Sequence, residues 1–394
     1  YQIDSEWVST SGSFSPSQRV VAISTSQVCR RRFRPHYRNF HAFADYTASE
    51  NDYYWSTKNY SVVHMTVLSV LDLSPIAEGG DARQALNNSR SLAQHAESAG
   101  YHRYWVAEHH NMRGIASAAT SVVIGHIAAG TSKIRVGSGG IMLPNHSPLM
   151  VAEQFGTLEA LHPGRIDLGL GRAPGTDGVT AHALRRTLNS DPNQFPQDVI
   201  DLKGYLSDQR GPGQRVTAVP GEGSNIPMYI LGSSLFGAQL AAILGLPFAF
   251  ASHFAPEAMM RAIALYRQEF EPSEQLSKPH VILGFNICAA DTEEEAMLLR
   301  SSGLRAFLNL RQGKAGPLPK PEEDFENNLT EMEKSLMTQV SSAAAVGNID
   351  QVRAQTAEFL AKTGADELII VAQIHDHEAR CKSYDLAYPA CADL

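Results

Sequence analysis

The sequence predicts an α/β fold, a (β/α)8 TIM barrel with insertions, on three observations. Strand and helix patterns alternate from residue 65 onward, eight strand–helix pairs fit into the length that remains, and the turns after the strands carry glycine and polar residues. An open doubly wound sheet is the structural alternative. The spread of polar turns over so many strand ends favours the barrel.

The predicted strands are short runs of branched, aliphatic and aromatic residues that end in turn-forming residues. They cover residues 67–73, 102–107, 134–140, 166–171, 228–231, 247–251, 281–289 and 367–372. Because all strands of a barrel run parallel and end at one mouth, we expect the residues that follow them to gather there.

The helices between these strands are recognised by their ends. Gly100 is placed to stop a helix over residues 82–99, Ser147 to cap a helix that begins at Pro148, and Gly364 to end the helix before it. Further helical patterns cover residues 117–129, 176–188, 198–207, 256–270 and 350–362, one ends at residue 244, and two begin near residues 292 and 376. We interpret residues 211–227 as a surface loop and the polar residues 313–330 as an excursion or lid.

Composition excludes several classes of protein. The chain has 394 residues, of which 43% are hydrophobic and 19% charged, as in ordinary globular proteins. The net charge of −8 argues against nucleic-acid binding, and no apolar run reaches the about 18 residues of a membrane helix. The four cysteines are scattered without a CxxC pair, which is typical of the reducing cytoplasm.

Residues 1–64 differ from the rest of the chain. They are rich in Ser, Tyr and Arg and show no helix or strand period, so we expect a disordered N-terminal extension that precedes a natural start at Met65. A targeting peptide and a nucleic-acid or membrane contact through the arginine run are the alternatives. The barrel domain is expected over residues 65–394.

Residues 165–177 contain a strand that ends in a turn with one fixed cation, Arg172. A guanidinium at the carboxyl end of a buried strand suits a phosphate or carboxylate. Gly232, Ser233 and Ser234 open a helix, where free N–H groups, two hydroxyls and the helix dipole favour a phosphate, although a plain helix cap is an even alternative.

Ser138, Gly139 and Gly140 end the third strand, and the two glycines leave space where a flat molecule could lie against the backbone. A phosphate site late in the barrel and a surface free of side chains early in it together fit a phosphorylated planar cofactor.

Glu108, His109 and His110 follow the second strand. Neighbouring residues of an extended chain point to opposite sides, so at most one of the two histidines faces the mouth. We interpret it as an acid/base group, with a loop-holding role as the alternative. A metal site needs several converging ligands, which this pattern does not supply, so we expect no metal.

Three motifs together with the strand at 164–175 resemble the bacterial luciferase-like flavin monooxygenases, closest to their uncharacterised single-chain members. The three motifs are residues 104–110 (YWVAEHH), residues 136–144 (VGSGGIMLP) with Glu153 and Gln154, and residues 364–368 (GADEL). The motifs occur in matching order from residue 65 to the C-terminus.

The resemblance implies an FMN-dependent monooxygenase that uses reduced flavin and O2 to oxygenate a small organic substrate. It implies a non-prolyl cis peptide at Gly139–Gly140 beneath the flavin ring and His109 as the active-site histidine, with Glu108 beside it. Arg172, Ser233 and Ser234 match phosphate-binding positions. The luciferases carry an acidic residue at the position of Gly232, so that contact must come from the backbone here.

The resemblance also leaves alternatives open. A deazaflavin-dependent hydride-transfer oxidoreductase uses the same barrel, and a non-catalytic flavin-binding protein is a third reading; a metal hydrolase comes last. No second nucleotide site is visible in the sequence, so we expect reduced FMN from a separate flavin reductase that uses NAD(P)H. A homodimer is expected, and luminescence is not.

Overall fold

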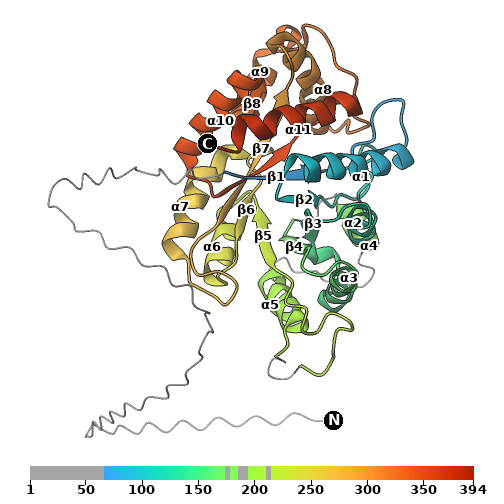
Figure 1. The fold of residues 1–394 in the computed structure, drawn as a ribbon, viewed down its shortest axis with the longest axis vertical. Coiled ribbons are helices and arrows are strands. Elements are labelled where there is room, and N and C mark those ends of the chain that lie inside the picture. Colours follow the sequence, from blue (N-terminus) through green and yellow to red (C-terminus); the bar gives the residue numbers. More distant parts are fainter. Residues whose placement is uncertain (1–65, 174–177, 185–193, 210–213) are drawn as a thin grey trace, which may run out of the picture. The chain divides into compact units, whose positions relative to one another are not determined.

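Parallel strands form the centre of the computed structural model, which describes residues 66–173, 178–184, 194–209 and 214–394. Eight of these strands pair in a closed ring, each with its neighbours in the chain, and the last strand of the ring pairs with the first (Figure 1). They are β1 (Val67–Asp72), β2 (Arg103–Val106), β3 (Arg135–Met142), β4 (Ile166–Gly171), β5 (Met228–Gly232), β6 (Phe248–Phe250), β7 (Val281–Ala289) and β9 (Glu367–Val371). The predicted TIM barrel is confirmed. The expectations for residues 1–64 lie outside the described residues.

A ninth strand corrects the predicted count of eight. β8 (Ala344–Gly347) pairs in parallel with the last four residues of β7, from Asn286 to Ala289, outside the ring. β9 pairs with β7 only as far as Asn286, so the end of the long strand β7 has a free edge, which β8 occupies. The sequence did not predict β8 because it is four small residues without a strand pattern, and it did not predict the helix before it, α9.

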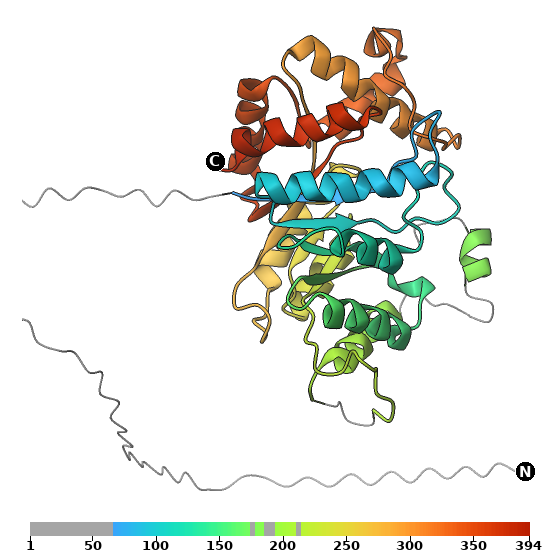
Figure 2. The same cartoon turned by 45° about the vertical axis from the view of Figure 1, so that its right-hand side comes forward.

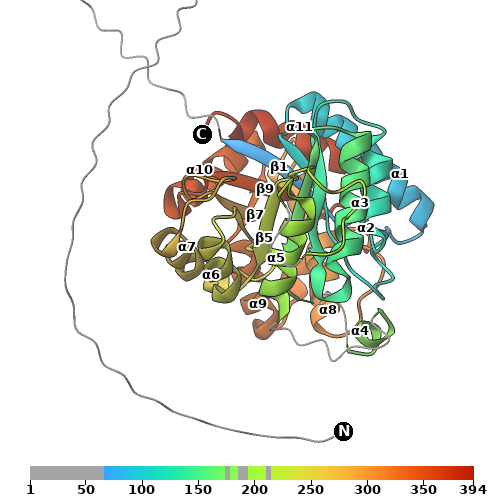
Figure 3. The same ribbon diagram turned by 90° about the horizontal axis from the view of Figure 1, so that it is seen from below.

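Helices surround the strands, and Figure 3 shows them on all sides of the ring. They are α1 (Ala82–Ala99), α2 (Thr120–Ala128), α3 (Pro148–Leu161), α4 (Gly178–Leu184), α5 (Phe195–Leu206), α6 (Leu235–Ile243), α7 (Met259–Glu269), α8 (Glu293–Arg311), α9 (Glu331–Ser341), α10 (Ile349–Thr363) and α11 (His377–Cys391). Figure 2 shows α11 beside α1, so the last helix closes the outer layer next to the first. The described residues include the short 3-10 turns η1 (Leu143–Asn145), η3 (Pro256–Ala258) and η4 (Phe325–Asn328).

The helix ends follow the predicted signals with one exception. Gly100 and Gly364 end α1 and α10 in the left-handed conformation, at φ 105° and φ 59°. Thr292 caps α8 by accepting a hydrogen bond from the Glu295 N–H. Ser147 precedes Pro148 as expected, but its side chain makes no capping hydrogen bond.

The strand side chains alternate between two apolar layers. Leu68 and Val70 pack outward against the helices, whereas Leu71 lies with Trp105 and Ile282 in a separate cluster inside the ring. No helix of the described part of the chain combines the length and the apolar character that crossing a membrane requires.

Charged residues lie in the barrel at the amino ends of the strands. Arg103 donates to Asp167 and to Glu367, each at 2.8 Å, and all three side chains are buried. Burial alone would raise the pKa of Glu367, but the Arg103 charge and hydrogen bonds from His280 and Ser69 lower it to about 2. This ionic network lies at the opposite end of the strands from the mouth.

Candidate active site

The strand ends that the sequence singled out are neighbours. Met142 of β3 is in register with Gly171 of β4, which is in register with Leu231 of β5. Gly232 pairs in turn with Phe250 of β6. The residues after these strands therefore lie at the same mouth of the barrel.

Arg172 and the start of α6 come together through an aromatic contact. The guanidinium carbon of Arg172 lies 4.1 Å from the ring centre of Phe236, in the first turn of α6. Ser234 occupies the N-cap position without a side-chain capping bond, and Ser233 precedes it. A cation, two hydroxyls and a helix N-terminus thus lie close together, which is a set that fits a phosphate.

Gly232 has open space on its side-chain side. A Cβ atom built there would meet only the Cα of Gly237, at 3.8 Å. Packing therefore does not require glycine at this position, and the space next to the start of α6 stays accessible.

The two glycines of β3 are required by packing inside the barrel. A Cβ on Gly139 would lie 2.6 Å from Leu71 and 3.0 Å from Trp105, and one on Gly140 would lie 2.7 Å from the carbonyl oxygen of Gly169. Packing within the protein is therefore one reason for these glycines, and their predicted contact with a planar cofactor stays a prediction. The peptide bond between them is cis, as the resemblance implies.

The hydroxyl of Ser138 is used within the sheet. It donates to the Gly169 carbonyl oxygen at 2.9 Å and accepts from the Gly169 N–H at 3.0 Å, and the side chain is fully buried. Any contact between this part of β3 and a cofactor would therefore come from the main chain.

Glu108 joins the ends of β2 and β3. Its Oε1 atom lies 2.7 Å from His110 Nε2 and 2.8 Å from His146 Nε2, and its Oε2 atom accepts from the Met142 N–H at 3.1 Å. Burial alone would raise the pKa of Glu108, but the hydrogen bonds from His146, His110 and Met142 hold it below its ordinary value. Glu108 is thus an ionised positioning group, bonded to His110.

The same three side chains contain a possible set of metal ligands. Ligand atoms of Glu108, His110 and His146 lie within 4.8 Å of one another. Two ligands on a tetrahedral zinc ion would be separated by about 3.3 Å, given a metal–ligand distance of about 2.0 Å. The 2.7 and 2.8 Å separations are those of direct hydrogen bonds, which account for the cluster without an ion. The absence of a metal stays a prediction.

His109 has a second histidine near it. His253, three residues beyond β6, has a pKa of about 4 because it is buried and because His109 adds an unfavourable charge interaction. Neither His253 nor His146 has a role in the prediction from the sequence. A histidine directly after a strand was the available signal for His253, whereas His146 acts through its contact with Glu108, which only the folded chain reveals.

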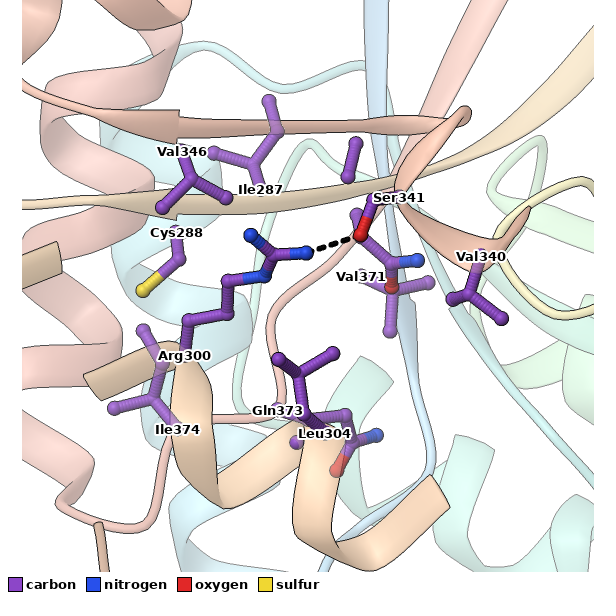
Figure 4. Close-up of a pocket in the computed structure, with 13 residues that line it drawn as sticks. Ile287, Cys288, Arg300, Leu304, Val340, Ser341, Val346, Val371, Gln373 and Ile374 are labelled. Carbon is purple, nitrogen blue, oxygen red and sulfur yellow. Dashed lines mark hydrogen bonds between the residues drawn. The ribbon is translucent and has the colours of Figure 1, made fainter. Parts of the chain in front are cut away.

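A small cavity between β7, β8, α8 and α9 is a separate feature. Figure 4 shows Arg300 in it, donating to Ser341, beside Cys288. Its volume of about 60 Å³ has room for about two water molecules and is too small for a cofactor. Burial raises the pKa of the Cys288 thiol to about 12, which makes that thiol unreactive.

Two curated relatives share much of this sequence. A luciferase-like monooxygenase of Escherichia coli (strain K12) is 53% identical over 326 residues, which cover 83% of this chain and 97% of the relative. The N-acetyl-S-alkylcysteine monooxygenase of Bacillus subtilis (strain 168) is 40% identical over 237 residues, covering 59% of this chain and 70% of the relative.

Solved structures share the fold. Apo-MsnO8 is 34% identical with a TM-score of 0.74, and the match covers 82% of this chain and 98% of that one. The oxygenating constituent of a Pseudomonas putida 3,6-diketocamphane monooxygenase, in complex with FMN, is 17% identical with a TM-score of 0.63 and covers 83% and 98%. An F420-dependent secondary alcohol dehydrogenase is 15% identical with a TM-score of 0.61 and covers 83% and 99%.

The model of the luciferase-like monooxygenase family matches residues 65–367, which include every strand of the ring except the last four residues of β9. Together with the relative that is 53% identical, this match shows that the chain belongs to the luciferase-like monooxygenases, a family of oxidoreductases.

Proposed function

We propose that the protein is an FMN-dependent monooxygenase that uses reduced flavin and O2 to oxygenate a small organic substrate. The observation that carries the proposal is the position of Arg172 over Phe236, at the start of α6 and beside Ser233 and Ser234. The family match and a fold neighbour that binds FMN support it.

The residues of the mouth have separate tasks in this proposal. Arg172, Ser233, Ser234 and the backbone at Gly232 would hold the phosphate, and the main chain of Ser138, Gly139 and Gly140 would lie against the ring. When bound, reduced flavin would supply two electrons to O2. One oxygen atom of O2 would enter the product, and the other would leave as water.

His109 would transfer protons in this reaction. It follows the buried Glu108, whose bonds to His110 and His146 connect the segments that follow the neighbouring strands β2 and β3. The apolar cluster inside the ring of strands, which contains Leu71 and Trp105, keeps water out of the barrel below the site.

A deazaflavin-dependent hydride transfer is the second candidate, favoured by the fold shared with an F420-dependent alcohol dehydrogenase. Both cofactors are phosphorylated tricyclic rings, so the phosphate site serves either. A flavin-binding protein without turnover is the third. We further propose a separate NAD(P)H-dependent reductase as the source of reduced FMN, and a homodimer in the cytoplasm.

Two measurements on the purified protein test the function. Mass spectrometry of the released cofactor should find FMN, and finding F420 would replace the proposal by the second candidate. Reduced FMN, ¹⁸O2 and N-acetyl-S-methylcysteine, a probe suggested by the Bacillus subtilis relative, should then yield product with one labelled oxygen atom. Loss of this thioether without label, or turnover of the probe without O2, would contradict a monooxygenase.

A further inference from the structure

His253 lies inside the barrel mouth, on the inner side of β7. A Cβ atom built on Gly284 would lie 2.0 Å from His253 Nδ1, so the imidazole occupies the space that a side chain of Gly284 would fill. Ile282, two residues earlier on β7, belongs to the cluster inside the ring, and residues two apart on a strand point the same way. The imidazole ring of His253 therefore lies next to the apolar cluster inside the barrel, which contains Ile282.

Two hydrogen bonds to β7 hold this segment in place. Ser252 Oγ donates to the Gly284 carbonyl oxygen at 2.7 Å, and Asn286 Nδ2 donates to the His253 carbonyl oxygen at 2.8 Å. Both bonds leave the imidazole nitrogens unused. The position of the ring is thus set by its backbone and by the absence of a side chain at Gly284.

The Nδ1 atom of His253 is buried and has no hydrogen-bond partner among the described residues. A buried polar atom without a partner costs free energy, and such atoms at a mouth are commonly paired by a ligand or by water. Because burial and His109 lower its pKa to about 4, the ring is neutral near pH 7 and offers one donor and one acceptor.

We propose that His253 is a second active-site histidine, a binding residue that forms a hydrogen bond with the polar edge of the cofactor ring. The inference rests on the proposed function only in requiring a tricyclic cofactor in the mouth. Flavins and deazaflavins share the same pyrimidinedione edge, with N–H and C=O groups that a neutral imidazole can pair, so the inference holds for either cofactor.

Fluorescence titration of the apoprotein with oxidised FMN and with riboflavin tests the role. His253→Ala should raise the Kd for both ligands about tenfold, the loss of one hydrogen bond, and His253→Gln should recover part of the affinity. His126→Ala is the matched control, because His126 Nε2 is also buried and without a partner among the described residues, but lies on α2 outside the ring. The control should bind both ligands like the wild type.

Folding and the identity of the cofactor are checked separately. Circular dichroism and the Tm establish that each variant folds. If His253→Ala does not fold, the role of His253 is tested by the His253→Gln titration and by the shift of the His253 ring ¹⁵N resonances on addition of FMN. A folded variant with wild-type Kd for FMN and riboflavin would overturn the inference. If the wild type binds F420 and not FMN, the proposed function fails. The Kd for F420 in the wild type and in the His253 variants then tests the role of His253. Binding of neither cofactor would overturn both.

Discussion

Glu108 and Glu367 are buried carboxylates whose pKa values are lowered against the effect of burial. In Glu108 hydrogen bonds from two histidines and the Met142 N–H outweigh burial, and in Glu367 the Arg103 charge does so. A carboxyl group with a lowered pKa in the folded state stabilises the protein above its unfolded pKa, and this stabilisation is lost as the pH falls through the folded pKa.

Acid titration of the stability follows from these shifts. For Glu367 the loss should extend from about pH 4.5 to about pH 2 and amount to about 3 kcal/mol. Urea denaturation between pH 6 and pH 3 should show a free energy of unfolding that falls with pH in the wild type. Glu367→Gln and Glu108→Gln should be less stable at pH 6 and should have a flatter pH dependence. An unchanged slope in Glu367→Gln would show that this carboxyl is not the titrating group.

His109 is the residue on which the proton-transfer role depends. His109→Ala should lower kcat by about 10²- to 10⁴-fold, the usual contribution of a general acid or base, and leave the Kd for FMN unchanged. Steady-state rates with the thioether probe and fluorescence titration separate the two effects. A wild-type kcat in a His109→Ala variant that still binds FMN would contradict the proton-transfer role of His109.

Sequence reasoning reached individual residues only where a local pattern carried the information. Arg172 and Ser234 stand at the end of a strand and the start of a helix, which a sequence reveals, and the structure brings them to one mouth. The bond between Glu108 and His146 and the packing of Leu71 and Trp105 against Gly139 could not be predicted, because both depend on residues that are distant in the sequence.

At the scale of elements, β7 pairs with three strands: β6, β9 and β8. The eight ring strands were predictable because their apolar runs are long enough to show a pattern. β8 was not, since its four small residues are held in place by the free end of β7 rather than by a propensity of their own.

Gly284 of β7 tests the geometry of this element. Gly284→Ala should lower the free energy of unfolding by about 1–3 kcal/mol, because the added Cβ would meet His253 Nδ1. In the His253→Ala background the same substitution should cost less, by at least about 1 kcal/mol. A double-mutant cycle from urea denaturation measures the difference, and equal costs in both backgrounds would mean that the two residues do not touch.

At the scale of the whole molecule, the buried ionic network and the candidate active site lie at opposite ends of the strands. Arg103 and Glu367 are the first residues of β2 and β9, whereas Glu108 and Arg172 follow the last residues of β2 and β4. In TIM barrels the amino-terminal end commonly serves stability and the carboxyl-terminal end function.

Breaking the ionic network should therefore affect stability alone. Arg103→Ala leaves the buried Glu367 without its cation and should cost about 3–5 kcal/mol of unfolding free energy. The folded fraction of this variant should bind FMN with the wild-type Kd. Urea denaturation and fluorescence titration at 10 °C measure the two quantities. A large loss of FMN affinity would show that the two ends are coupled.

If a phosphorylated cofactor is bound where Arg172 meets α6, then Arg172→Ala should change the affinity for FMN and not the affinity for riboflavin. The two ligands differ by the phosphate alone. In fluorescence titrations, Arg172→Ala should raise the Kd for FMN about 10- to 100-fold, the worth of a charge-assisted hydrogen bond, and leave the Kd for riboflavin at its wild-type value. Equal Kd values for FMN in both proteins, or equal losses for FMN and riboflavin, would contradict it.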